Sequence, residues 1–393
     1  MRATTATVLR SLLIGFCLSS SCSQTVLDAG LVTRSTVDEF ADISLDIREI
    51  RNYRSDSTRI QTLWDDGLHF VSSDGHRGSL EKITSDVTAN TSPISVIHQQ
   101  GLATAFVVPR PNFLTDTVHN IIASDPELAA ETTLSSVLWL YAANLLFDGV
   151  QTCHLRSTAD NPNFVPQGTY GFDEFIALWM GRDLSANNSL YGLTQEISEL
   201  FGLNAPEAKA NTAIKLLYQQ AAATLALPNA CTKDNPTTAS QLWMVAVQIT
   251  NEMVKPLFQS LLHAIEAADT KRAKIYASAL IPHLYKCRPS LFRHFADPLV
   301  TGNILQADAD SLKLGLQDAA VNCFGIPCSQ LSKNGYALSC ADESEPQDYQ
   351  IAGYRTRSKA AATVSALFVD LHETSLTLLL LAPSFLELTS IFE

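Results

Sequence analysis

Apolar side chains recur along this chain with the three-to-four-residue spacing of helices that bury one face. The clearest run follows Trp243, with apolar positions at Ala246, Val247, Val254, Leu257, Phe258, Leu261, Leu262 and Ile265. This spacing continues across Pro256, so we expect one long helix that is kinked at the proline. Alternating patterns are scarce, and the best of them, Ala103–Val108, also suits the end of a helix. The pattern therefore predicts an all-α, multi-helix fold with few or no strands.

Two helix starts combine a capping residue, a proline and an acid. Ser-Asp-Pro-Glu at 124–127 opens an apolar run to Cys153, and Asn-Ala-Pro-Glu at 204–207 opens an alanine-rich segment that ends before Pro228. Proline suits the first helical position because the amide hydrogen that it lacks has no partner there. Further helices are expected over Ala307–Cys323 and Ser358–Leu381.

The first residues are typical of a secretory signal peptide. Arg2 and Arg10 supply positive charge, 12–18 is apolar, and small residues follow. Cleavage near residue 23 would export a protein without a further membrane span, to the extracellular or periplasmic space. Cleavage before Cys22 would instead resemble a lipoprotein, but Ser19 stands where that motif carries Leu.

Six cysteines remain after residues 1–23, and an even number in an exported chain predicts disulfides. Among about 15 possible pairings, we favour Cys153–Cys231, Cys287–Cys323 and Cys328–Cys340. The alternative, buried free thiols in a cytosolic protein, requires that the leader is not a signal peptide. We expect two helical halves, residues 24–235 with the first pair and residues 236–393 with the other four cysteines.

Composition narrows the classes of partner. With 27 basic and 40 acidic residues the net charge is −13, while 46% hydrophobic residues indicate a folded chain. A negative surface disfavours nucleic acid and anionic lipid, and it favours metal cations. Asn90 and Asn187 begin glycosylation sequons, which matter only in a eukaryotic host.

The familiar catalytic motifs are absent from the sequence, including Gly-x-Ser-x-Gly, His-Glu-x-x-His and the glycine-rich phosphate loops. We therefore expect a protein that is not an enzyme. Paired carboxylates are the remaining candidates, because hard cations such as ferric iron and calcium prefer several oxygen ligands.

Four of these carboxylates form the predicted metal site. Asp173 and Glu174 begin the segment 172–181, and Glu196 and Glu199 lie three residues apart on the next predicted helix, 190–200. A short connection makes successive helices antiparallel, which would bring the four side chains together. The alternatives are that Asp173 and Glu174 only cap a helix and that the other acids lie on solvated faces. Asp65 and Asp66 with His69 form a weaker candidate.

Several segments together resemble a known family. They are Val-Leu-Trp-Leu-Tyr at 137–141, Gly-Phe-Asp-Glu-Phe-Ile-Ala-Leu-Trp-Met-Gly at 171–181, Leu-Tyr-Gly-Leu at 190–193 and the closing Cys231. This order is similar to a module of the low-iron-inducible periplasmic, or iron-assimilation, proteins of green algae and diatoms. The resemblance spans about residues 40 to 375. Residues 369–374 repeat the apolar-Asp-apolar-x-Glu pattern of residues 45–50, and this repeat would mark the start of a second, truncated module. One departure is Leu-His-Phe at 68–70, where a short polar run is expected.

The resemblance implies a secreted, α-helical protein, without enzyme activity, that assists iron uptake. The leading interpretation is therefore an exported acidic protein that binds or concentrates iron, or another hard cation, at the cell surface. The alternative is an extracellular structural or interaction protein without a metal function, whose partner is a cell-wall polymer or a cell-surface protein.

Overall fold

The computed structural model describes residues 25–27, 31–71, 75–106, 112–158, 170–184, 187–204, 206–301 and 309–331. These residues are mainly helical, and strand pairing among them is confined to two isolated bridges, Val26 with Val32 and Val71 with Arg77. The predicted all-α fold is thus confirmed. The signal peptide, the helix expected over 358–381 and Cys340 lie outside the described residues.

The helices follow one another in this order: α2 (Asp38–Asn52), α3 (Ser57–Asp66), α4 (Leu80–Ala89), α5 (Pro93–Phe106), α6 (Phe113–Ser124), η2 (Pro126–Leu128), α7 (Ala129–Thr132), η3 (Thr133–Leu138), α8 (Trp139–Thr158), α9 (Gly171–Met180), α10 (Leu190–Leu200), α11 (Lys209–Leu225), α12 (Thr237–Glu266), α13 (Thr270–Leu280), η4 (Ile281–Leu284), α14 (Pro289–Thr301), α15 (Ala309–Phe324) and η6 (Cys328–Gln330). Most elements labelled η are short 3₁₀ turns, and η3 is a π-helix.

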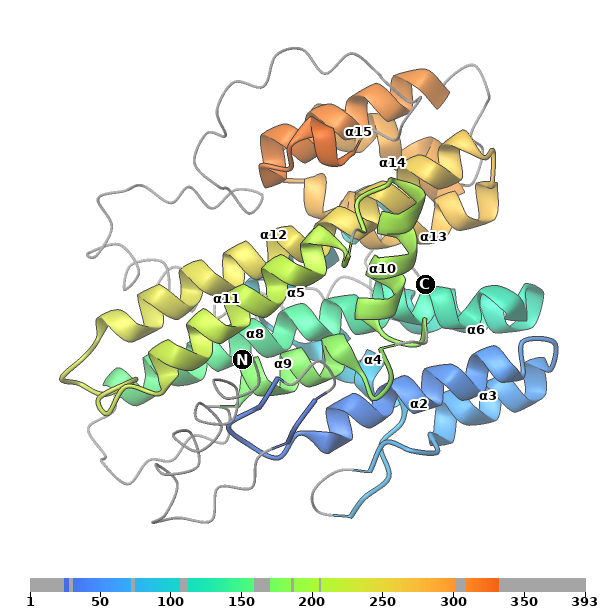
Figure 1. Cartoon of the computed structure of the whole chain (residues 1–393). Helices are drawn as coiled ribbons and strands as arrows, with labels where there is room; N and C mark the ends of the chain where they lie inside the picture. Colours follow the sequence, from blue (N-terminus) through green and yellow to red (C-terminus); the bar gives the residue numbers. More distant parts are fainter. Residues whose placement is uncertain are drawn as a thin grey trace, which may run out of the picture. The chain divides into compact units, whose positions relative to one another are not determined.

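The central element is α12, the 30-residue helix that the periodic run after Trp243 predicted. It contains Pro256 and packs against α8, α11, α13 and α15 (Figure 1). The Trp139 indole nitrogen on α8 donates a hydrogen bond to the Met253 carbonyl on α12 at 2.8 Å. That bond fixes the two helices in register within the core.

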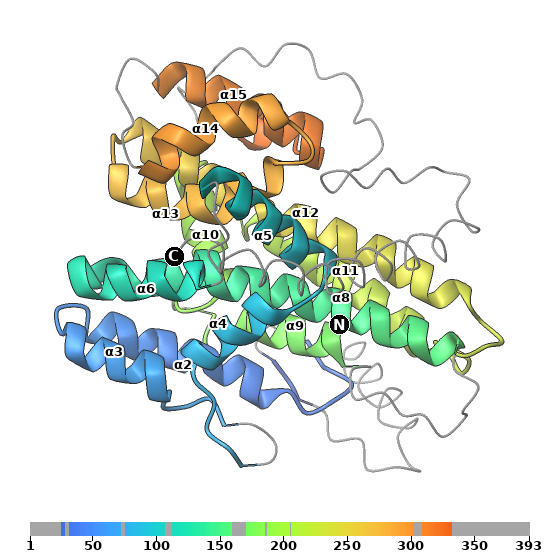
Figure 2. The same cartoon turned by 180° about the vertical axis from the view of Figure 1, so that it is seen from behind.

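Helices α2, α4 and α5 cover parts of α8 and α9. Helix α2 packs on α9, while α4 and α5 pack on α8 from the side that Figure 2 turns toward the reader. The segment with the best strand-like pattern belongs to α5 as far as Phe106, so its interpretation as a helix end is confirmed up to that residue.

Two of the three expected disulfides are present, Cys153–Cys231 and Cys287–Cys323. The third expected bond involves Cys340, outside the described residues, and stays a prediction. The first bond joins the C-terminal part of α8 to the connection between α11 and α12. Helices α11 and α12 pack on each other. All described residues belong to one compact unit. Residue 235, where the two expected halves meet, lies in the connection between α11 and α12.

The two proline-marked helix starts differ in outcome. Pro126 begins the helical run that continues through α8, as expected. The second start is displaced, because α11 begins at Lys209 rather than Pro206. Glu207 lies before the helix, where its carboxylate accepts hydrogen bonds from the Tyr191 and Thr212 hydroxyls and pairs with Lys215.

Among the described residues, one helical run, Pro126–Ser157, is long and apolar enough to cross a membrane. Its most apolar window is 89% buried inside the protein. Core helices of soluble proteins commonly meet the same criterion.

Candidate functional site

Asp173, the first predicted metal ligand, is buried at the start of α9. One carboxylate oxygen accepts hydrogen bonds from the Arg34 amide at 2.8 Å and the Ser35 hydroxyl at 2.9 Å. The other oxygen accepts from the Tyr218 hydroxyl at 2.8 Å. Asp173 therefore ties the N-terminal segment and α11 to α9, which is a structural role beyond the helix capping considered from the sequence.

Glu174, the second predicted ligand, is half-buried in an acidic environment. Burial, followed by the charges of the neighbouring carboxylates Glu39, Asp148 and Asp173, raises its pKa to about 7. The pKa of Tyr141 is also raised, first by burial and then by the charges of Glu174, Asp86, Asp148 and Glu39. We call Glu39, Asp86, Asp148 and Glu174 the acidic cluster.

The other two predicted ligands, Glu196 and Glu199, are both exposed on α10. Helices α9 and α10 have the expected bounds and pack on each other. The α9 carboxylates, Asp173 and Glu174, nevertheless interact with side chains other than Glu196 and Glu199. In the part of the chain that the structure describes, no three His, Cys, Asp or Glu side chains are arranged to hold a metal ion. The same is true of the acidic cluster, whose four residues are all described.

In the weaker candidate site of Asp65, Asp66 and His69, Asp65 and His69 have different partners. Asp65 accepts a hydrogen bond from Gln61 at 2.8 Å and lies 3.8 Å from the His119 imidazole. The segment 68–70 instead binds Asp46, whose carboxylate accepts hydrogen bonds from the three backbone amides. This buried aspartate holds the chain after α3 against α2.

The two sequons differ in exposure. Asn187 is exposed, whereas Asn90 is half-buried and its amide donates a hydrogen bond to Asp148 at 3.2 Å. Glycosylation of either residue stays a prediction.

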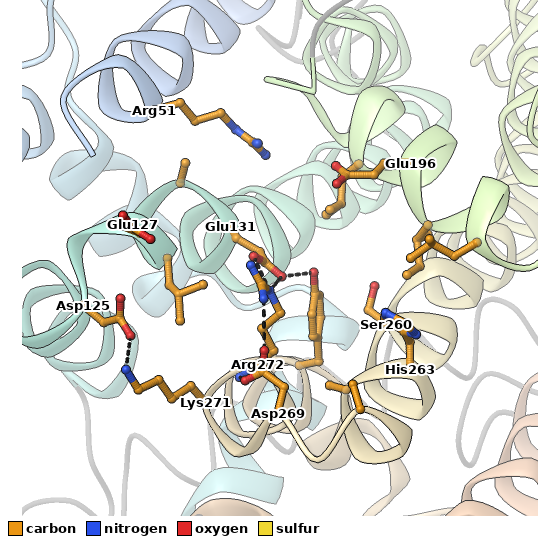
Figure 3. Close-up of a pocket in the computed structure, with 18 of the residues that line it drawn as sticks. Arg51, Asp125, Glu127, Glu131, Glu196, Ser260, His263, Asp269, Lys271 and Arg272 are labelled. Carbon is orange, nitrogen blue, oxygen red and sulfur yellow. Dashed lines mark hydrogen bonds and ion pairs between the residues drawn. The ribbon is translucent and has the colours of Figure 1, made fainter. Parts of the chain in front are cut away.

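A cleft of about 770 Å³ lies where α2, α10, α12 and α13 meet the segment from η2 to α7 (Figure 3). Its acidic lining residues are Asp125, Glu127, Glu131, Glu196 and Asp269. Its basic lining residues are Arg51, Arg54, Lys271 and Arg272. Only Glu196 among them was a candidate site residue from the sequence, because the others lie in small groups spread over more than two hundred positions.

Ion pairs cover one side of this cleft. Arg272 binds Glu131 at 3.0 Å and Asp269 at 3.0 Å, while Lys271 binds Asp125. The Tyr276 hydroxyl also donates to Glu131. Burial, followed by the Glu131 charge, raises the pKa of Tyr276 well above its ordinary value, so this hydroxyl remains a proton donor. The network fixes α13 against α7.

The π-helix η3 helps to place Glu131. It follows α7 directly and packs against α10 and α13, which are two walls of the cleft. A π-helical turn holds one residue more than an α-turn, so it changes the direction of the preceding side chains relative to α8. The Ser135 hydroxyl donates to the Glu131 carbonyl at 2.9 Å, which supports the altered backbone pattern.

The opposite side of the cleft carries charges that are not paired with one another. Arg51 and Arg54, at the end of α2, form no ion pair within the described ranges. The Arg51 Nε atom is buried without a hydrogen-bond partner there. Figure 3 shows the Arg51 guanidinium and the Glu196 carboxylate entering the same space from α2 and α10.

Comparison with known proteins identifies no relative: no protein-family model matches the chain, and neither a curated protein nor a solved structure matches it significantly.

Proposed function

We propose that this protein is an exported binding protein that holds a small, carboxylate-rich anion in the cleft, and that its cargo is ferric iron complexed by such an anion. The cell-surface iron uptake expected from the family resemblance then operates on a complex instead of a bare ion. The two disulfides are compatible with an extracellular or secreted protein.

The observation that carries the proposal is the position of Arg51. Its side chain enters the cleft, its Nε donor is buried, and no described carboxylate neutralises it. A buried donor without a partner costs about 1–3 kcal/mol, and more when it is charged. A ligand that accepts this hydrogen bond recovers that free energy.

The chemistry of the guanidinium selects the ligand class. Its planar donors match the two oxygens of a carboxylate, and Arg54 adds a second guanidinium at the same end of α2. Ferric complexes of polycarboxylates are negatively charged and can present carboxylate oxygens to such donors. Ligand pockets are commonly about 300–1,000 Å³, so a cleft of this size accommodates one small complex.

Isothermal titration calorimetry with citrate, ferric citrate and calcium chloride tests the proposal on the oxidised, full-length mature protein. We expect ferric citrate to bind, and we expect the double variant Arg51→Gln/Arg54→Gln to bind it at least tenfold more weakly. Arg48→Gln is the matched control, because Arg48 lies on the same helix and pairs with Glu49 outside the cleft.

The ligands separate the alternatives. Binding of ferric citrate without binding of citrate supports the iron cargo, whereas equal binding of both supports a polycarboxylate-binding protein without an iron function. If neither binds, or if the double variant behaves like Arg48→Gln, the proposal is wrong. The interaction-protein alternative then stands.

A further inference from the structure

The charges that line the cleft do not all cancel. The ion pairs on one side involve the basic residues Lys271 and Arg272. Other lining charges have no ion-pair partner within the described ranges, and these are Arg51, Arg54, Glu127 and Glu196. A ligand in this cleft therefore meets unpaired charges of both signs.

Glu196 is held at the cleft by a well-packed helix. The Ser189 hydroxyl caps the start of α10 by accepting a hydrogen bond from a backbone amide at 3.1 Å. Leu193 and Ile197, on either side of Glu196 along the helix, are buried and also line the cleft. The Glu196 carboxylate is exposed to solvent and enters the space that the Arg51 guanidinium enters from α2 (Figure 3).

A buried hydroxyl belongs to the same cleft. Ser260 on α12 is only 2% exposed, and its Oγ atom has no hydrogen-bond partner among the described residues. It lies near the Tyr276 hydroxyl, whose pKa it lowers against the larger effect of burial, but without the geometry of a hydrogen bond. Buried polar groups in native proteins almost always have a partner. The interior of the cleft is therefore suited to a polar ligand atom.

An unpaired carboxylate is unfavourable in a site for a simple anion. Glu196 would repel citrate and so oppose the attraction from Arg51 and Arg54. A metal chelate has a different distribution of charge, because its outer carboxylate oxygens are negative while its centre is a cation. Such a complex can direct its outer oxygens to the guanidinium groups and its metal to the carboxylate. Both signs of unpaired charge then attract the same ligand.

We propose that Glu196 binds the metal centre of the chelate directly and adds one oxygen ligand to it, an inference that rests on the proposed function. One bond forms between a Glu196 oxygen and the ferric ion, one coordinated water leaves to the solvent, and the oxidation state does not change. Carboxylate oxygens are the ligands that hard cations prefer. The chelator supplies the remaining ligands, so the site does not require a set of three protein ligands, which the described residues lack. The Ser260 hydroxyl is available to donate to a chelator oxygen.

The direction in which one substitution changes two affinities tests this contact. Isothermal titration calorimetry compares Glu196→Gln with the oxidised, mature parent protein for citrate and for ferric citrate. Glutamine has a similar size but no charge, and it is a poor ligand for ferric iron. We expect the variant to bind citrate no more weakly than the parent, because a repulsion is removed. We expect it to bind ferric citrate about tenfold more weakly or worse, because a metal ligand is lost.

Two controls separate ligation from other effects. Glu199→Gln, on the same helix at an exposed position outside the cleft, should bind both ligands as the parent does. The second control ligand is tris(oxalato)chromate(III), whose oxalates occupy every coordination position and exchange very slowly. It presents carboxylate oxygens to Arg51 and Arg54, but Glu196 cannot reach its metal, so Glu196→Gln should not weaken its binding.

The outcomes distinguish this inference from the proposed function. If Glu196→Gln binds ferric citrate as tightly as the parent or more tightly, Glu196 is not a ligand, while the role of Arg51 and Arg54 is unaffected. Equal weakening of ferric citrate and tris(oxalato)chromate(III) also overturns the inference, because it indicates a change in the shape of the cleft. If the parent does not bind ferric citrate, both the inference and the proposed function are wrong.

Discussion

The cleft and the acidic cluster both concentrate carboxylates, but they differ in what neutralises the charge. In the cleft, Asp125, Glu131 and Asp269 are paired with Lys271 or Arg272. At the acidic cluster, every charge that shifts the pKa of Glu174 is another carboxylate. The two regions show that the position of an acid in the fold, rather than its local sequence, determines whether it stabilises the native state.

Asp173 and Glu174 give the same contrast between adjacent residues. Asp173 accepts three hydrogen bonds and is a connection point between segments. Glu174 is held near like charges, which favours its protonated form. Substitution of these neighbours should therefore change stability in opposite directions.

The largest effect is expected at Asp173. Asp173→Asn removes the charge and one acceptor oxygen, so at least one of the three donors loses its partner. We expect the free energy of unfolding to fall by about 2–4 kcal/mol, measured by urea denaturation at neutral pH. A variant as stable as the parent would contradict the assignment of Asp173 as a connection point.

The next effect is expected in the cleft. Glu131→Gln weakens the contacts with Arg272 and Tyr276, and because Arg272 is partly exposed we expect a loss of about 1–3 kcal/mol. The comparison is Glu127→Gln, another cleft carboxylate, which lies outside this hydrogen-bonded network. Equal losses in both variants would show that the network has no special role.

Glu174→Gln should stabilise the protein at high pH. The folded-state pKa of about 7 exceeds the ordinary value of 4.5, so ionisation costs stability as the pH rises between those values. We expect a gain of about 1–2 kcal/mol at pH 8, reduced by partial solvent screening, and no gain at pH 4. Chemical denaturation at both pH values measures the difference, with Glu199→Gln as an exposed control. A gain that is independent of pH would contradict the charge-repulsion account.

The smallest effect is expected at the rim of the cleft. Lys271 pairs with Asp125, but its side chain is 66% exposed, and exposed ion pairs contribute little to stability. Lys271→Gln should therefore leave the thermal unfolding midpoint unchanged. A clear decrease would indicate that the rim takes part in the Glu131 network.

The sequence predicted what depends on local spacing. The run after Trp243 gave α12, Pro126 gave a helix start, and the cysteine count led to two disulfides that the structure contains. Helical periodicity is local and repeated, so a single sequence contains enough information to detect it.

The contacts of the predicted site residues could not be predicted from the sequence, because their partners lie far away along the chain. Asp173 binds Arg34 and Ser35, which precede it by 139 and 138 residues. The short loop before α10 correctly predicted that α9 and α10 are neighbours. It could not predict which residues the Asp173 side chain contacts. The cleft likewise combines charged residues from four parts of the chain, and no motif marks them.

The π-helix η3 also makes the long run through α8 sensitive to a change of length. The wide turn accommodates one extra residue, so removing one residue from Thr133–Leu138 would restore α-helical hydrogen bonding with the flanking parts still in phase. A one-residue deletion in the regular helix that follows would instead rotate the part before it by about 100° relative to the rest of α8. Glu131 would then turn away from Arg272, and the cleft would lose the anchor of α13. In evolutionary terms, the same one-residue deletion would be tolerated within η3 and would remove a binding surface a few residues later.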